Sequence, residues 1–317
     1  MLGLAKHGIS ALSYAAYRAA KSASLRRMLF NSIRLNRMET ERFRSIEECG
    51  FLAYAFLNRH ESKSQILQDL WVSYELGEKR GGFFVEFGAT NGLVNSNTWL
   101  LEKKYGWKGI LAEPNPVWHS MLKANRDSAI DHRCVGSSTG KMVTFLTTDA
   151  SDPELSSIAE FASGDHFAEV RARGNEIKVE TVSLTQLLIE HKAPVEIDYL
   201  SIDTEGSEYD ILSHFDFSRH VVGVISVEQN RHTEAKIETL LTGHGYHRVF
   251  KEFSQWDGWY ARPERRRRGL RFAIDATSHI SGPPCTRSSG PAGEISKDLS
   301  SVARKDLPHL LRRQRNT

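Results

Sequence analysis

The stretch FFVEFGATNG, residues 83–92, decides how this chain folds. Its first half, Phe83–Phe87, is an apolar run that predicts a buried β-strand, because strands covered on both faces are hydrophobic throughout. Gly81 and Gly82 precede the run, and Gly88–Gly92 follows it as a turn. Glycines allow tight turns and close approach of a ligand to the backbone. We therefore expect a strand, a ligand-accessible loop and then a helix over 95–105.

Outward from this stretch, strands and helices alternate. Apolar runs predict further strands at 109–112, 131–135, 176–183, 197–202 and 221–227, and an extended piece at 141–146. Helical spacing predicts helices at 116–125, 184–191, 209–215 and 233–244, and residues 39–80 also read as helical. The last two runs, 246–252 and 255–261, have no helix between them and predict an antiparallel hairpin at the sheet edge. The pattern is typical of an α/β fold: a mostly parallel sheet with helices on both faces and an antiparallel edge strand.

The spacing of the glycines narrows the ligand class. A dinucleotide-binding loop has the pattern G-x-G-x-x-G, whose middle glycine lets a pyrophosphate approach. Here Thr90 occupies that middle position, which disfavours a pyrophosphate. Glu113 ends the next strand, where a carboxylate can accept hydrogen bonds from ribose hydroxyls. Together the loop and Glu113 favour an adenosyl ligand, and Glu86 is expected either to bind a ligand amino group or to hold the loop backbone.

Several segments in order resemble the FkbM-type methyltransferases: FFVEFGATNG, GILAEPNP, YLSIDTEGSEYDIL and ISVEQN. The preceding SQILQDLWV resembles the lead-in segment of that family, in which Ser64, Gln65, Gln68 and Asp69 recur. The resemblance covers residues 60–262 and implies the class I, Rossmann-like fold with seven strands. It also implies S-adenosylmethionine as the methyl donor and O-methylation of a carbohydrate, natural-product or other small-molecule hydroxyl. The family commonly has Asp or Asn where Thr90 and Asn91 stand, so this loop is a mild variant.

The residues expected to contact the cofactor lie on the loop, on the end of the next strand, on the lead-in segment and on a later strand. They are Glu86, Gly88, Ala89, Asn91, Gly92, Glu113, Pro114, Gln68, Asp69 and Asp203. Gln65 and Asp69, four residues apart, would share one face of a helix. A helix that only covers the surface is the alternative for this segment.

Carboxylates and one histidine follow the later strands. Asp203 and Glu205 follow 197–202, and Glu228 and His232 follow 221–227. Transfer to an alcohol requires removal of its proton, so these four residues are the candidate bases. Glu208 instead suits the first turn of a helix, where the dipole favours acids.

A metal ion is the alternative use of these strand ends. Oxygen ligands from Asp203, Glu228 and Asn230 would suit Mg²⁺. The residues do not form the adjacent Asp-Asn pair of metal-dependent relatives of this fold, so we expect a metal-free site and keep Mg²⁺ as the alternative cofactor.

The charge of the chain divides it into three parts. Residues 1–38 and 264–317 each carry about +7, which leaves about −11 on residues 39–263 of a chain with net charge +3. The acidic middle, the expected methyltransferase domain, argues against nucleic acid as a partner. The segment 1–38 suits a transit peptide, an amphipathic helix on an anionic membrane or a plain surface helix. The tail 264–317, with its basic run Arg265–Arg268, is expected to be disordered.

The remaining features set the context. Three cysteines, Cys49, Cys134 and Cys285, fit neither a zinc site nor a disulfide framework, so we expect a cytoplasmic protein with a peripheral membrane contact as an option. The polar loop 148–176 is expected to cover the acceptor site, with Ser156, Ser157, His166 and Arg171. A catalytically inactive binding protein of the same fold and an NAD-dependent oxidoreductase are the competing functions. The sequence assigns neither the acceptor nor an oligomeric state.

Overall fold

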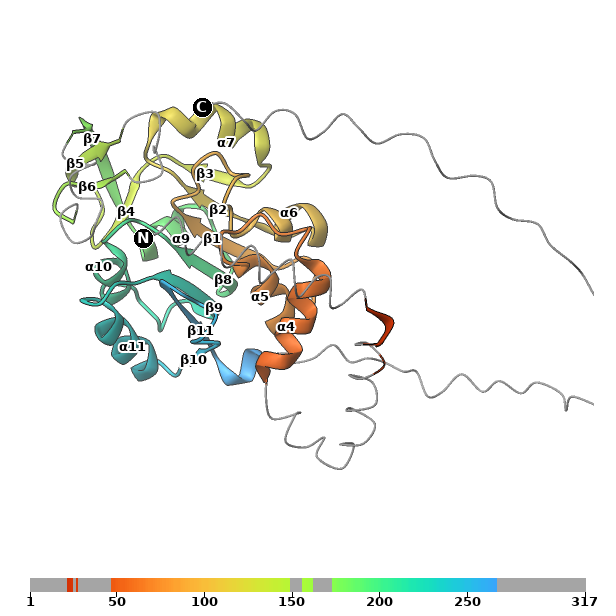
Figure 1. Ribbon diagram of the computed structural model, residues 1–317. Helices are drawn as coiled ribbons and strands as arrows, with labels where there is room; N and C mark the ends of the chain where they lie inside the picture. Colours follow the sequence, from red (N-terminus) through yellow and green to blue (C-terminus); the bar gives the residue numbers. More distant parts are fainter. Residues whose placement is uncertain (1–21, 25–26, 28–46, 149–155, 162–172, 267–317) are drawn as a thin grey trace, which may run out of the picture. The chain divides into compact units, whose positions relative to one another are not determined.

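The strand predicted at Phe83–Phe87 lies inside a sheet of seven strands. In the computed structural model (Figure 1), the seven strands follow the order β10-β11-β9-β8-β1-β2-β3. Strand β1 (Phe83–Phe87) pairs in parallel with β2 (Lys108–Ala112) and β8 (Glu196–Ile202). Strand β8 pairs in parallel with β9 (Val221–Glu228), and β2 with β3 (Ala129–Asp131). The mostly parallel, Rossmann-like sheet predicted from the sequence is confirmed.

Near one end of the seven-stranded sheet, one strand runs opposite to the other six. Strand β11 (Asp257–Ala261) is antiparallel to both β9 and β10 (His247–Val249). The predicted hairpin is therefore confirmed, but the reversed strand lies between β9 and β10, and the edge strand is β10. Strand β11 is buried along its whole length, which suits an inner position in a sheet covered on both faces.

Helices cover both faces because successive side chains of a strand point to opposite sides. Val85 and Phe87 belong to one core, packed by α9 (Leu184–Glu190), α10 (Glu208–Ser213) and α11 (Glu234–Gly243). Phe84 belongs to the other core, packed by α4 (Glu47–Asn58), α5 (Gln68–Glu75), α6 (Trp99–Tyr105) and α7 (Pro116–Asn125). Figure 1 shows α4–α6 and α10–α11 on opposite sides of the sheet.

A second, smaller sheet was not predicted. It has the order β4-β7-β5-β6, formed by β4 (Cys134–Gly136), β5 (Met142–Thr147), β6 (Ser157–Ile158) and β7 (Asn175–Ser183). The single strand expected at 131–135 is wrong: Asp131 ends β3 in the large sheet, and Cys134 starts β4 in the small one. Arg133 fixes this corner, since its guanidinium contacts the Asp131 carboxylate at 2.6 Å and the Glu190 carboxylate at 2.6 Å.

Other boundaries also differ from the sequence prediction, such as the helix expected over 95–105, which starts at Trp99. The lead-in helix starts at Gln68, because Leu67 before it has a left-handed backbone with φ 67°. Gln65 therefore precedes the helix and shares no helical face with Asp69. The chain also stays ordered beyond 263, where a 3-10 turn, Pro263–Arg265, is followed by Arg266, which forms a buried ion pair with Glu75. Arg265 pairs with Glu196 at 2.6 Å, so the first two arginines of the basic run bind the domain.

The structure describes residues 22–24, 27, 47–148, 156–161 and 173–266. The predicted N-terminal segment 1–38, apart from four residues, and the tail from 267 onward lie outside the described residues, as do Cys285 and the unit 273–317. Cys134 is buried in β4, and burial raises the pKa of its thiol to about 12. Among the described helices, none is long and apolar enough to span a bilayer.

Candidate active site

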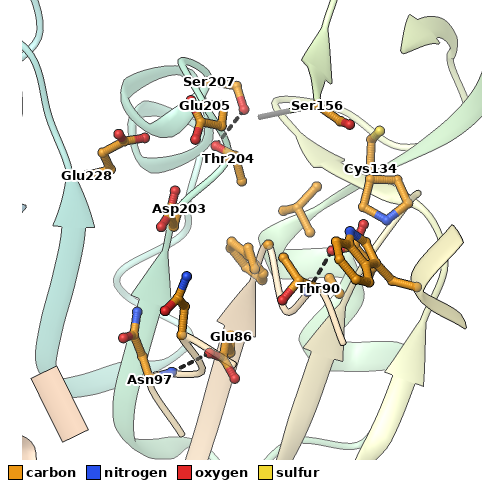
Figure 2. A pocket seen from close by; sticks show the side chains of 18 of the residues that line it. Glu86, Thr90, Asn97, Cys134, Ser156, Asp203, Thr204, Glu205, Ser207 and Glu228 are labelled. Carbon is orange, nitrogen blue, oxygen red and sulfur yellow. Dashed lines mark hydrogen bonds between the residues drawn. The ribbon is translucent and has the colours of Figure 1, made fainter. Parts of the chain in front are cut away.

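A cavity of about 690 Å³ opens at the carboxyl ends of β1, β2, β8 and β9. This edge of a parallel sheet is where ligands of such folds bind. Of the residues predicted to form the site, the lining contains Glu86, Gly88, Asn91, Glu113, Pro114, Gln68, Asp203, Glu205 and Glu228. Figure 2 shows the carboxylates of Asp203, Glu205 and Glu228 grouped on one side, with Cys134 and Ser156 across from them.

The loop after β1 requires glycine at two positions. Gly88 has φ 69°, and a Cβ there would lie 2.1 Å from the backbone oxygen of Asp203. Gly92 has φ 75°, and a Cβ there would meet Leu122 Cδ1 at 2.6 Å. The first glycine thus lets the loop pack against the end of β8, and the second lets it pack on α7. Ala89 and Gly92 are buried behind the loop and do not line the cavity, unlike Asn91.

The loop backbone is held from inside by side-chain oxygens. The Asn91 side-chain oxygen accepts from the backbone N–H groups of Leu93 and Val94, at 2.9 and 2.8 Å. On the β2 side, the two oxygens of Glu113 accept from the backbone N–H groups of Thr90 and Asn115, both at 2.8 Å. Glu113 is buried, and burial raises its pKa to about 7 although these two bonds lower it.

Glu86 belongs to a buried charge network. Its carboxylate accepts from the Ser96 hydroxyl, the Asn97 backbone N–H, the Thr98 hydroxyl and the Arg126 guanidinium. Arg126 lies between Glu86 and Glu102, at 3.4 and 3.2 Å, with all three side chains almost fully buried. The geometry therefore favours the second expectation for Glu86, that it holds the loop.

Three carboxylates meet at the ends of β8 and β9. Asp203, Glu205 and Glu228 each have an oxygen within 4.8 Å of the others. Burial first, and then the charges of Glu208 and Glu86, raise the pKa of Asp203 to about 6, although a hydrogen bond with Glu228 lowers it. Burial, and then Asp203 and Glu205, raise the pKa of Glu228 well above its ordinary value. Groups that repel each other in this way share protons near neutral pH.

Hydrogen bonds hold the turn after β8, which carries Glu205 of the acidic cluster. The Glu208 carboxylate accepts from the Thr204 backbone N–H at 3.0 Å and from the Gly206 N–H at 2.9 Å. Glu208 starts α10, so the prediction that it serves a helix N-terminus is confirmed. Ser157 donates to the backbone oxygen of Glu205 at 2.8 Å, which ties the small sheet to the turn.

The lead-in segment divides into a lining residue and a structural one. Gln68 lines the cavity and donates to the Asp257 carboxylate at 3.0 Å. Asp69 is buried outside the lining, where its carboxylate accepts from the Ser62 hydroxyl at 2.6 Å and the Lys63 N–H at 2.9 Å. Gln68 is thus part of the cavity lining, whereas Asp69 bonds the turn before α5.

Two residues expected beside the cluster do not line the main cavity, although Asn230 lines a small neighbouring pocket with Glu205 and Glu228. His232 is exposed, does not line the cavity and accepts from the Arg231 guanidinium at 3.1 Å. The Asn230 side-chain oxygen accepts from the backbone N–H of His232 at 2.8 Å and is used by its own turn. Of the expected metal ligands, Asp203 and Glu228 meet, and Glu205 takes the third place.

The predicted cover loop is described only in part. Ser156 lines the cavity and accepts from Asn115, the N-cap residue of α7, at 3.1 Å. His166 and Arg171 lie outside the described residues. The lining residues that the sequence reasoning missed include Asn97, Trp118 and Trp256. The polar run Asn95–Thr98 directly before a helix was the one signal that pointed to Asn97.

Comparison with known proteins identifies a family whose model matches the chain. The family model of the methyltransferase FkbM domain matches residues 86–248, which is just over half of the 317 residues. No curated protein matches the sequence significantly. A precorrin-6y C5,15-methyltransferase from Geobacter metallireducens is a similar solved structure, with 14% identity and a TM-score of 0.32, covering 61% of this chain and 84% of that one. A human methyltransferase 10 domain containing protein has 11% identity and a TM-score of 0.34, covering 68% and 95%.

Proposed function

The chain belongs to the FkbM methyltransferase family, and on this premise we propose that it transfers the methyl group of S-adenosylmethionine to a hydroxyl oxygen of a carbohydrate or another small molecule. The observation that supports this most is that one cavity contains both a nucleoside-type half and a proton-accepting half. Glu113 and the glycine loop form the first half, and Asp203, Glu205 and Glu228 form the second. A cavity of about 690 Å³ is within the range of ligand sites.

The residues present fit the cofactor. Each Glu113 oxygen accepts one backbone N–H and retains a lone pair for a ribose hydroxyl. Gly88 lines the cavity beside Glu113, with Asn91 and Pro114 alongside. When bound, the cofactor supplies a methyl group on a sulfonium, which is a leaving group that needs no further activation.

The remaining chemistry falls to the acidic cluster. Asp203 and Glu228 form a proton-accepting pair at the ends of β8 and β9. In our proposal, Glu228 takes the proton of the acceptor hydroxyl. The rest of the contribution is positioning, which is large for an in-line displacement. Three carboxylate oxygens would also suit Mg²⁺. The proposed mechanism is metal-free, and it fails if a chelator abolishes turnover and added Mg²⁺ restores it.

We also propose the limits of the parts that carry this function. The methyltransferase domain spans 39–263 with Arg265 and Arg266 as an extension that binds it. The basic segment 1–38 stays a candidate for contact with an anionic membrane surface or for targeting. Flotation with anionic liposomes, for the full chain and for a chain that lacks 1–38, tests the membrane alternative.

The function is tested first by binding and then by turnover. Calorimetric titration with S-adenosylmethionine, S-adenosylhomocysteine and NAD should show heat for the two sulfur nucleosides and none for NAD. Radiolabelled S-adenosylmethionine, offered with panels of sugars, glycosides and simple alcohols, should then label an alkali-stable ether. No binding of either sulfur nucleoside at millimolar concentration refutes the proposal. Binding without transfer to any acceptor class favours the inactive binding protein.

Removing the Glu113 carboxylate should weaken nucleoside binding. We expect Glu113→Ala to raise the Kd of S-adenosylhomocysteine roughly 10-fold or more, because hydrogen bonds to a charged group are worth about 1.5–3 kcal/mol. Calorimetry measures the Kd, and Glu252→Ala, which removes an exposed carboxylate outside the cavity, serves as the matched control. An unchanged Kd in Glu113→Ala would place the ribose elsewhere.

A further inference from the structure

The side-chain oxygen of Asn97 is an acceptor without a donor. Asn97 is 6% exposed and lines the cavity. Its amide nitrogen donates to the Ser201 hydroxyl oxygen at 3.0 Å, whereas its Oδ1 is buried and has no hydrogen-bond partner among the described residues. A buried acceptor left unpaired is costly, so it is a feature that needs an explanation. A donor supplied by the ligand would explain it.

The position of this oxygen is fixed from two sides. The Asn97 backbone N–H donates to Glu86 Oε1 at 2.7 Å, and Ser96 and Thr98 on either side also bond to Glu86. The amide nitrogen reaches across to Ser201 on β8. Figure 2 shows Asn97 beside Glu86, on the same side of the cavity as Asp203. The acceptor is therefore preorganised before any ligand binds.

Glu86, the nearest carboxylate, is already engaged. Its two oxygens receive three hydroxyl or backbone donors and the Arg126 guanidinium. A ligand cation would have to compete with Arg126 for it inside a buried network. Asn97 Oδ1 has no hydrogen-bond partner among the described residues, so a ligand donor would meet no such competitor there.

The strand order says which end of the cofactor reaches Asn97. Glu113 follows β2, on one side of β1, whereas Ser201, the partner of Asn97, lies in β8, on the other side. A cofactor with its ribose at Glu113 therefore extends across the end of β1 toward Asn97 with its amino-acid end. A bridge between Ser64 and Asn95 brings the lead-in segment to the same side.

The amino-acid end offers one strong donor, its α-ammonium, and one acceptor, its carboxylate. An unpaired acceptor selects the ammonium. We propose that Asn97 Oδ1 accepts a hydrogen bond from the α-ammonium group of S-adenosylmethionine and so positions the methyl donor. The inference rests on the proposed function, because it presupposes this cofactor with its ribose at Glu113.

The test compares two ligands that differ in the amino group alone. S-adenosylhomocysteine and its deaminated analogue, which keeps the carboxylate, are titrated calorimetrically into the wild type, Asn97→Ala and the control Asn58→Ala, whose amide bonds a remote helix carbonyl. We expect the wild type to prefer the aminated ligand roughly 10-fold or more, and Asn97→Ala to lose most of that preference. The Kd of the deaminated analogue should change less than about threefold, since its remaining contacts are intact.

Each outcome separates this inference from the proposed function. If the wild type binds neither ligand, the proposed function fails. If Asn97→Ala keeps the full preference for the amino group, the role of Asn97 is wrong, although the methyltransferase proposal stands. If the alanine variant does not fold, Asn97→Ser is measured in its place, because its hydroxyl can still form a hydrogen bond within the protein. The same loss of preference for the aminated ligand is expected.

Discussion

Replacing Arg126 with methionine is expected to cost about 3–5 kcal/mol of unfolding free energy, because breaking a buried ion pair leaves its partner charge uncompensated. Arg126 is the cation between Glu86 and Glu102, and its side chain is fully buried. Its guanidinium also donates to the backbone oxygen of Gly92 at 3.3 Å and to the Thr98 hydroxyl at 2.8 Å. The variant would leave two buried carboxylates without the cation between them, and the Gly92 backbone oxygen without its guanidinium donor.

Urea unfolding at pH 7 measures this cost. Lys123→Met removes an exposed positive charge from the last turn of α7 and is the matched control, expected to lose less than about 1 kcal/mol. Adding Glu86→Gln and Glu102→Gln to Arg126→Met should restore part of the stability, since the orphaned charges are then gone. Equal losses for Arg126→Met and Lys123→Met would contradict the prediction.

The same variant has a defined pH dependence. Burial alone raises the pKa of Glu102, but Arg126 and the bond from Ser128 outweigh it and lower the pKa below its ordinary value of 4.5. A lowered folded-state pKa adds stability above the unfolded value, and this is lost as the pH falls. Without Arg126 that contribution disappears. The stability difference between wild type and Arg126→Met should therefore be largest near neutral pH and shrink as the pH approaches 4.

The sequence predicted well the elements whose signal is local. The strand Phe83–Phe87 matches β1 at both ends, because an apolar run between glycines has few other solutions, and the helix 116–125 matches α7, with Asn115 as N-cap and Pro116 as its first residue. The break between β3 and β4 was missed, and the residue in this corner, Arg133, contacts Glu190, 57 residues away. The later start of the lead-in helix, at Gln68, was missed because Leu67 takes a left-handed conformation that its residue type does not indicate.

The candidate site was predictable to the same extent. Parallel strands bring their carboxyl ends to one edge, so Glu113, Asp203 and Glu228 were found from strand ends alone. Which acids remain available to a ligand depends on partners distant in sequence. The Glu86 carboxylate accepts from Arg126, 40 residues later. The amide nitrogen of Asn97 donates to Ser201, 104 residues later, and this orientation leaves the amide oxygen without a donor among the described residues. No local pattern contains that information.

The second large effect concerns Glu228, the residue that we propose as the base. Its pKa is raised by burial first and by Asp203 next, so it holds a proton more readily than an ordinary carboxylate. General base catalysis is most effective when the pKa lies near the working pH. We expect Glu228→Gln to lower kcat roughly 10²-fold or more, because an amide of the same shape cannot accept the proton.

The pH dependence of the rate tests the role of Glu228 independently. The base works in its ionised form, so the wild-type rate should rise with pH as the shared proton leaves the Asp203–Glu228 pair. Because the pKa of Asp203 is raised to about 6, and that of Glu228 is also raised, the rise should lie above the range of ordinary carboxylates. Glu228→Gln should lose most of this rise in rate. In the variant Asp203 has no Glu228 carboxylate with which to share the proton.

The measurement separates catalysis from binding and from folding. The initial rate is followed with the acceptor identified in the radiolabel assay, and the Kd of S-adenosylhomocysteine is followed by calorimetry. Glu228→Gln should keep that Kd within about twofold, since Glu228 lies in the acceptor half and the cofactor contacts remain. Glu252→Gln, an exposed carboxylate, should change neither value. If Glu205→Gln abolishes the rate while Glu228→Gln keeps it, the base is Glu205, because the cluster offers both oxygens within 4.8 Å.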